Sequence, residues 1–197
     1  MIARFAAALA LLLALPAAAQ SPPSAPVKVA LETSMGRILV QLEPAKAPLT
    51  VANFLRYVDA KRFDGVAFYR AMKLPWGAGL IQAGQRDPKK LYPPIKHEPT
   101  TQTGLSHTEG AISMARFAPG TATADFTIMV GDMTGLDAKP AAAGDNLGFA
   151  AFGRVVEGME VVKAIWAAPT SPTLGEGPMK GQMLAPTVKL VSVRRVP

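Results

Sequence analysis

Two histidines and no cysteine limit the chemistry that this 197-residue chain can support. His97 and His107 stand outside any H-E-x-x-H motif, which disfavours a zinc hydrolase, and we expect His97-Glu98 to be an exposed loop pair. The absence of cysteine excludes disulfides, thiol nucleophiles and cysteine-ligated metals. The sequence contains no phosphate-binding or dinucleotide-binding glycine motif and no G-x-S-x-G motif of an α/β-hydrolase. We therefore expect no metal and no other cofactor.

Side-chain alternation along the short β-prone runs shows which residues share a face. Leu80 and Gln82 are two residues apart, as are Asp125 and Thr127. Because side chains alternate along a strand, each pair projects from one face. Arg70 lies in a third run, and its guanidinium can donate hydrogen bonds from a planar fork without losing its own charge.

The segments that must position these residues are short and separated by Gly and Pro. Residues 27–33 and 37–42 are a predicted hairpin that turns at Gly36. Six more β-prone runs follow, at 66–72, 79–82, 111–115, 126–130, 149–156 and 187–193. Apolar residues recur at helical spacing in residues 47–61 and 159–167. About eight strands and two helices favour a mainly β fold, a closed antiparallel barrel with helices over its ends.

The N-terminus has the pattern of a secretory signal peptide, predicted at residues 1–19. Arg4 precedes an apolar run too short to span a bilayer, and small residues at 17–19 suit cleavage before Gln20. Residues 20–26 are a predicted linker, and residues 27–197 a single domain. No later segment is long and apolar enough to cross a membrane, so we expect no membrane attachment after cleavage.

The chain is basic, with a formal net charge of +7. Its basic residues are scattered in ones and twos and are not interleaved with aromatics, so we interpret the charge as a soluble basic surface and expect no nucleic-acid partner. Nothing in the sequence indicates oligomerisation, and we expect a monomer.

Five sequence blocks occur in an order that resembles one known family. They are TVANFL (50–55), FDGVAFYR (63–70), LIQAG (80–84), SMAR (113–116) and FAAFGRVVEGM (149–159). Together they resemble the motifs of cyclophilin-type peptidyl-prolyl cis-trans isomerases, over nearly all of residues 27–193. The resemblance implies a cyclophilin-like barrel that isomerises exposed X-Pro bonds in client polypeptides. The last block is similar to bacterial members, and with the leader it predicts assistance to protein folding in a periplasm.

The resemblance also implies a site. Arg70 matches the family arginine that donates to the prolyl nitrogen, and Gln82 matches the glutamine that positions it. An amide resists rotation with a barrier of about 18–20 kcal/mol because the nitrogen lone pair is delocalised, so a donor at nitrogen would lower the barrier. The implied substrate-binding residues are Phe68, Trp76, Leu80, Met114, Ala115, Arg116, Asp125, Phe126, Thr127, Leu147 and Phe149.

Three departures from the family pattern affect this site. Asp125 stands where the family often has glutamine, and Thr127 where it usually has the phenylalanine that floors the proline pocket. Extra residues at 73–78 lengthen the spacing between Arg70 and Gln82. Candidates to replace the missing wall are Trp76, Phe117 and Phe149.

The altered pocket leaves a second hypothesis open, a proline-segment binding module or chaperone with weak or no turnover. A third, a small-ligand carrier barrel, is supported only by the strand count.

Overall fold

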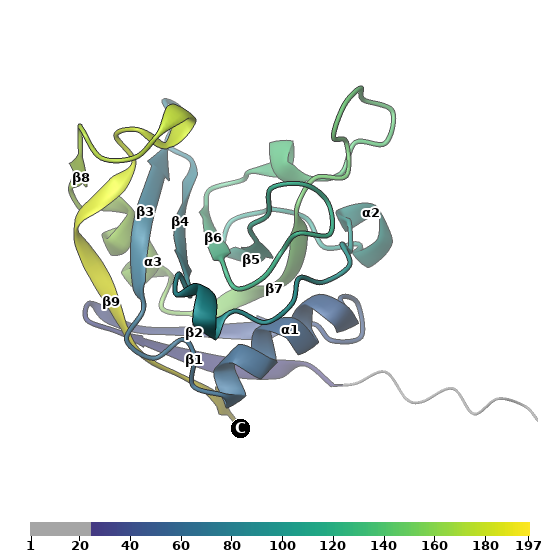
Figure 1. The fold of residues 1–197 in the computed structure, drawn as a ribbon, viewed down its shortest axis with the longest axis horizontal. Helices are drawn as coiled ribbons and strands as arrows, with labels where there is room; N and C mark the ends of the chain where they lie inside the picture. The colour runs from purple at the N-terminus through teal and green to yellow at the C-terminus, as the bar shows by residue number, and fades with distance from the viewer. Residues whose placement is uncertain (1–24) are drawn as a thin grey trace, which may run out of the picture.

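The computed structural model describes residues 25–197, so the signal peptide predicted at residues 1–19 and most of the 20–26 linker lie outside the described residues. Antiparallel pairing runs in the order β1, β2, β7, β5, β6, β4, β3, β9 and returns to β1 (Figure 1). These strands are β1 (Val27–Thr33), β2 (Gly36–Leu42), β3 (Ala67–Lys73), β4 (Gly79–Gly84), β5 (Ala111–Met114), β6 (Phe126–Val130), β7 (Ala150–Glu157) and β9 (Met183–Val196). The mainly β, eight-stranded barrel is confirmed. A further short strand, β8 (Thr170–Ser171), pairs with β9 and was not predicted.

Both predicted helices form, α1 (Pro48–Asp59) and α3 (Met159–Ala167). α1 contacts β7 and β9, whereas α3 contacts β2, β3, β4 and β6. Each helix contacts strands that are not adjacent in the barrel order. Each helix therefore lies across an open end of the barrel. Shorter elements are α2 (Thr100–Thr103) and the 3₁₀ turns η1 (Pro88–Lys90), η2 (Thr134–Leu136) and η3 (Gly177–Met179). Among the helices of residues 25–197, none has the length and apolarity of a membrane span.

Aromatic rings fill the barrel beneath α1. Phe54 of the helix lies 5.1 Å from Phe63 and 5.3 Å from both Phe126 and Phe152, measured between ring centroids. All four rings are buried. Because burial of an aromatic side chain contributes strongly to stability, this cluster fixes α1 against the strands that carry the site.

Glu98 corrects one expectation, because it is buried and not part of an exposed loop pair. Its carboxylate accepts hydrogen bonds from the backbone N–H groups of Leu49 (3.1 Å) and Thr50 (2.8 Å), in the first turn of α1. Those N–H groups have no partner within the helix, and Ala47 at the N-cap has no side-chain acceptor. A distant carboxylate therefore caps α1, an arrangement that local sequence does not reveal.

Candidate active site

A row of polar residues crosses four neighbouring strands on the outside of the barrel. Strand register places Arg70 of β3 opposite Gln82 of β4, Gln82 opposite Thr127 of β6, and Thr127 opposite Ser113 of β5. Residues that flank the row along each strand point inward and join the core, except Tyr69, which lies at a β-bulge of β3 before Arg70. The row brings together residues that are far apart in sequence.

The guanidinium of Arg70 is held between two amide oxygens. Its Nη1 donates to Oε1 of Gln82 and its Nε donates to Oε1 of Gln182, both at 2.8 Å. Burial lowers the pKa of Arg70 below its ordinary value, although the group stays charged at neutral pH. Nη2 has no hydrogen bond within residues 25–197, so this nitrogen can donate to a ligand. Gln182 was not predicted, because it lies in the C-terminal segment outside every recognised motif.

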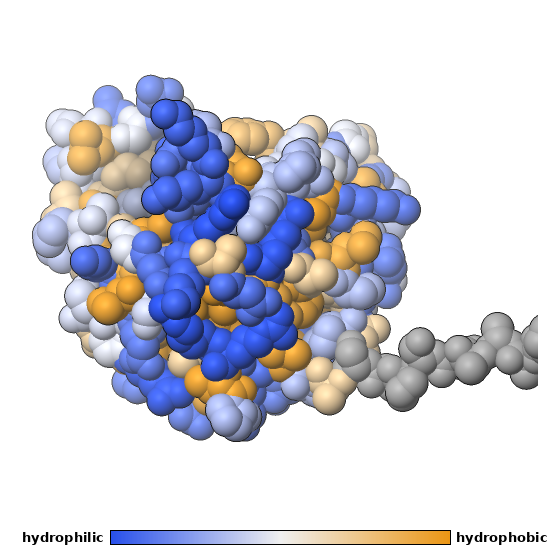
Figure 2. Space-filling view, turned by 60° about the horizontal axis from the view of Figure 1, so that its bottom comes forward, coloured by the Kyte–Doolittle hydropathy of each residue, from blue (hydrophilic) through white to orange (hydrophobic). Residues whose placement is uncertain are grey.

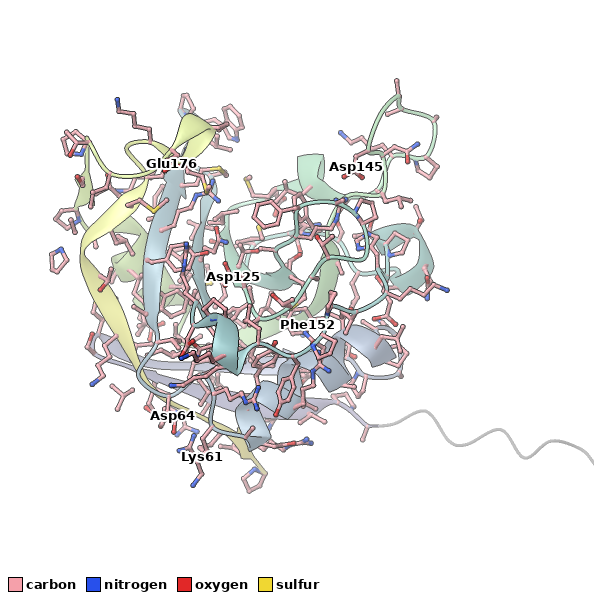
Figure 3. The ribbon with its side chains drawn as sticks, viewed as in Figure 1. Lys61, Asp64, Asp125, Asp145, Phe152 and Glu176 are labelled. Carbon is pink, nitrogen blue, oxygen red and sulfur yellow. The ribbon has the colours of Figure 1, made fainter. Side chains whose placement is uncertain are left out.

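Asp125 and Tyr69 fix the orientation of the Gln82 amide. The Tyr69 hydroxyl donates to Oδ2 of Asp125 at 2.5 Å, and Nε2 of Gln82 points to the same oxygen at 3.4 Å. Burial and the nearby carboxylate raise the pKa of Tyr69, so the phenol keeps its proton. Burial also raises the pKa of Asp125, against the opposing effect of its hydrogen bond from Tyr69. Figure 3 shows Asp125 near β4 and β6. With Nε2 directed at Asp125, Oε1 of Gln82 faces Arg70.

An apolar row lies next to the polar one on the same outer face. Met72 is opposite Leu80, and Leu80 is opposite Met129. Leu80 and Met129 belong to a small buried apolar cluster, and Leu136 of η2 packs against that cluster. An apolar ring placed against this row would lie within reach of the Arg70 guanidinium, which is the combination that a prolyl amide requires.

The far end of the polar row is braced by a fully buried histidine. His107 has 0 % exposure, with Nδ1 2.6 Å from Oδ1 of Asp137 and Nε2 2.8 Å from Oγ of Ser113. Burial lowers the pKa of His107, so the neutral ring donates through Nδ1 and accepts the Ser113 hydroxyl at Nε2. Burial alone would raise the pKa of Asp137, but hydrogen bonds from Ser106 and His107 hold it below its ordinary value.

This Ser113–His107–Asp137 arrangement has the order of a nucleophilic triad but not its accessibility. Ser113 is 1 % exposed, so its hydroxyl cannot reach a substrate. Its carbonyl accepts a hydrogen bond from Thr127 Oγ1 at 3.3 Å, which links the brace to the polar row. Across residues 25–197, no three His, Asp or Glu side chains gather as a metal-ligand group.

Three residues assigned to substrate binding are corrected by the structure. Phe68, Met114 and Phe126 point into the barrel and are at most 2 % exposed. The rings of Phe68 and Phe126 are 6.0 Å apart in an edge-to-face arrangement. They occupy the inward positions of strands whose outward positions carry the site, so their side chains stabilise the wall without contacting a ligand.

Of the three candidates for the missing wall, only Phe149 adjoins the apolar row. Its backbone N–H donates to the carbonyl of Leu136 at 3.0 Å, and its side chain is partly buried. Trp76 is 72 % exposed and Phe117 is 94 % exposed, so neither packs as a pocket wall. Leu147, also assigned to substrate binding, is an exposed loop residue, and Leu136 takes the place expected for it beside Leu80.

Arg116 is occupied by contacts within the chain. Its guanidinium donates to both carboxylate oxygens of Asp145, at 2.5 and 2.9 Å, and to the carbonyl of Gly148. Figure 3 shows Asp145 at the loop that projects beyond α2. The neighbouring Ala115 binds through its backbone, its N–H donating to the carbonyl of Asp125 at 2.9 Å. Arg116 therefore anchors the 138–148 loop next to the site.

Sequence comparison supports the resemblance over most of the chain. A family model for cyclophilin type peptidyl-prolyl cis-trans isomerase/CLD matches residues 28–194. The chain is 38 % identical to peptidyl-prolyl cis-trans isomerase cyp18 of Streptomyces antibioticus, over 75 % of this chain and 87 % of that protein. It is 35 % identical to peptidyl-prolyl cis-trans isomerase B of Escherichia coli, over 72 % of this chain and 85 % of that protein.

Structural comparison agrees at the level of the fold. A crystal structure of a cyclophilin type peptidyl-prolyl cis-trans isomerase from Cryptosporidium parvum has a TM-score of 0.69 to this chain. It is 17 % identical and covers 88 % of this chain and 99 % of that one.

Proposed function

This chain belongs to the cyclophilin-type peptidyl-prolyl cis-trans isomerases, and we propose that it isomerises X-Pro bonds in exported polypeptides, with Arg70 as the catalytic donor. The isomerase activity follows from family membership. The observation that supports the role of Arg70 is its guanidinium, held by Gln82 and Gln182 beside an apolar row.

Catalysis requires the prolyl nitrogen to recover its lone pair while the bond turns. In the planar amide that lone pair is delocalised into the carbonyl, and in the twisted amide it is localised on nitrogen. A hydrogen bond from Nη2 of Arg70 is therefore stronger in the transition state than in either planar isomer. An interaction of this kind lowers the barrier, because only preferential binding of the transition state accelerates a reaction.

The apolar row supplies the other half of the mechanism. Leu136 and Phe149, which are partly exposed, offer the proline ring a surface that excludes water, and the buried Leu80 and Met129 support it from beneath. Holding the ring still lets the preceding carbonyl swing while the nitrogen stays at Arg70. Exclusion of water also strengthens the hydrogen bond from the guanidinium. Thr127 contributes less apolar area than an aromatic residue, so this wall depends on its neighbours.

The export of the protein is supported by the leader pattern at residues 1–19 and the spacer that follows it. We place the mature enzyme in the periplasm of a Gram-negative bacterium, acting as a single chain on newly exported polypeptides. Cell fractionation with N-terminal sequencing tests this, because the periplasmic form should begin at Gln20. Recovery of the intact N-terminus in the cytoplasmic fraction would contradict it.

NMR exchange spectroscopy on a short X-Pro peptide tests the activity itself, because it measures cis-trans interconversion without a coupling protease. Substoichiometric protein should accelerate exchange well above the uncatalysed rate. Uncatalysed isomerisation takes roughly tens to hundreds of seconds at about 25 °C. Binding of the peptide without faster exchange would identify a proline-binding module in place of an enzyme.

A further inference from the structure

A polar hollow adjoins the active site at the start of β3 and the end of β4. Its volume is about 330 Å³, and backbone from Ala67 and Gly84 forms part of its floor. Asp64, Arg86 and Lys90 contribute charged side chains to its wall. Tyr69, the residue next to catalytic Arg70, lines the hollow with its ring and closes the side toward Asp125.

The charges in this hollow do not balance. Asp64 is already paired, because its two oxygens each accept a hydrogen bond from the guanidinium of Arg194 at 2.7 Å. Arg86 lies over the Tyr69 ring, 4.6 Å from its centroid, and forms no salt bridge within residues 25–197. Lys90 is exposed and, in the same described part of the chain, likewise has no acidic partner. Two cations therefore face the hollow without a carboxylate at ion-pair distance, and the acid that acts on Arg86 is the partly buried Asp125, which already accepts the Tyr69 hydroxyl.

The surface around the hollow extends this positive charge. Lys61, Arg62 and Lys89 lie on the flanking turns, and none forms a salt bridge within the described residues. Arg62 stacks over the Tyr92 ring at 3.8 Å instead of meeting an acid. Figure 2, in which the lower side of Figure 1 comes forward, shows hydrophilic residues around smaller apolar patches on this face. A potential of one sign over a concave surface attracts anionic groups.

The distance to Arg70 fits a polypeptide substrate. Ala67 precedes Arg70 by three residues on β3, but a β-bulge at Tyr69 lets them span only the two residues from Gly84 to Gln82 on β4, which is about 7 Å. A substrate lying extended along the barrel surface advances by a similar length per residue. The hollow would therefore receive the side chain of a residue about two positions from the proline.

We propose that this hollow is a specificity subsite for a carboxylate side chain of the substrate, about two residues from the isomerised proline, bound by Arg86 and Lys90. The proposal rests on the isomerase function proposed above. It makes acidic segments that flank proline the preferred substrate class. The same surface could attract a nucleic acid, but its continuity with Tyr69 and Arg70 favours a polypeptide.

Matched peptides with one proline test the proposal, with Glu or Gln placed in turn at each position on both sides. We expect kcat/KM for the Glu peptide to exceed that for its Gln partner roughly two- to tenfold at one position about two residues from proline, the range for one or two exposed ion pairs. The ratio should approach one in about 1 M salt, where the Debye length is about 3 Å.

Lys90→Gln combined with Arg86→Gln should abolish the difference between Glu and Gln peptides. Lys90→Gln alone should reduce it while leaving the rate with the Gln peptide unchanged. Lys46→Gln is the matched control, because Lys46 is an exposed lysine that lines a separate hollow with Glu43. That variant should keep the full Glu preference.

Equal rates for all Glu and Gln pairs, or a preference that survives the double substitution, would overturn the subsite. So would a single-stranded oligonucleotide whose binding needs Arg86 and Lys90 while no Glu preference exists. Failure of the isomerase function would look different, because the Gln peptides themselves would then exchange at the uncatalysed rate.

Discussion

Replacing Gln182 with alanine tests whether the guanidinium must be clamped from both sides. The substitution removes the acceptor of the Arg70 Nε hydrogen bond, 2.8 Å long. A hydrogen bond to a charged group contributes about 1.5–3 kcal/mol. Gln182 is partly exposed, so water can replace the lost oxygen and recover part of that energy. The remaining loss of about 1 kcal/mol predicts a kcat roughly fivefold lower.

Gln82→Ala should have a larger effect than Gln182→Ala. Gln82 is 7 % exposed, so water has little access to the Nη1 group that its Oε1 now holds. A loss of about 2–3 kcal/mol predicts a kcat roughly 30- to 150-fold lower. Both substitutions misplace the donor without removing the apolar row, so KM should change much less than kcat.

NMR exchange rates measured at several peptide concentrations separate kcat from KM for these variants. Gln41→Ala is the matched control, because Gln41 also makes a side-chain hydrogen bond, to Glu43 at 2.9 Å, but lies on β2 away from the site. An unchanged kcat in Gln182→Ala, or an equal loss in Gln41→Ala, would refute the clamp.

Three further predictions concern stability. Burial holds the pKa of His107 below its unfolded value, so the contribution of the neutral ring to stability is complete above about pH 6.5 and is lost as pH falls. Below about pH 6.5, the free energy of unfolding measured in urea should therefore fall more steeply in wild type than in His107→Gln. Gly84→Ala should cost about 1–3 kcal/mol, because the new Cβ would lie 2.0 Å from Oδ1 of Asp125, whereas Gly135→Ala, with no atom within 4 Å, should change the unfolding midpoint little. Leu80→Ala should lower the free energy of unfolding by about 2–5 kcal/mol and raise KM, because it opens the apolar row. Leu174→Ala, at an exposed position, should change neither quantity. Equal effects of the two substitutions would contradict the assignment of Leu80 to the apolar row.

The number and periodicity of the short β-prone runs favoured the barrel, although β4, β5 and β6 are buried at every position. The same periodicity placed Leu80 and Gln82 on one face, and the structure has both on the outer face beside Arg70. Treating whole motifs as site residues led to the errors at Phe68, Met114 and Phe126. Alternation along those strands already distinguishes inward from outward positions, so that part of the correction was accessible from sequence.

Other parts of the site depend on contacts between distant segments. Gln182 lies directly before β9 and binds Arg70 from 112 residues along the chain. No periodic or motif signal in the sequence indicates this pairing. Glu98 caps α1 from 48 residues away, and His107 meets Asp137 over 30 residues. Hydrogen bonds of this kind are determined by the packed fold, so local pattern alone does not identify their partners.

The rate of Arg70→Lys beside Arg70→Ala tests the central claim most directly. Lysine keeps the positive charge but lacks the planar fork that Gln82 and Gln182 hold. If a positioned guanidinium donates to the prolyl nitrogen, both variants should fold normally by circular dichroism and lose at least roughly tenfold in kcat/KM on an X-Pro peptide. A well-folded Arg70→Ala protein with wild-type exchange rates would contradict the mechanism.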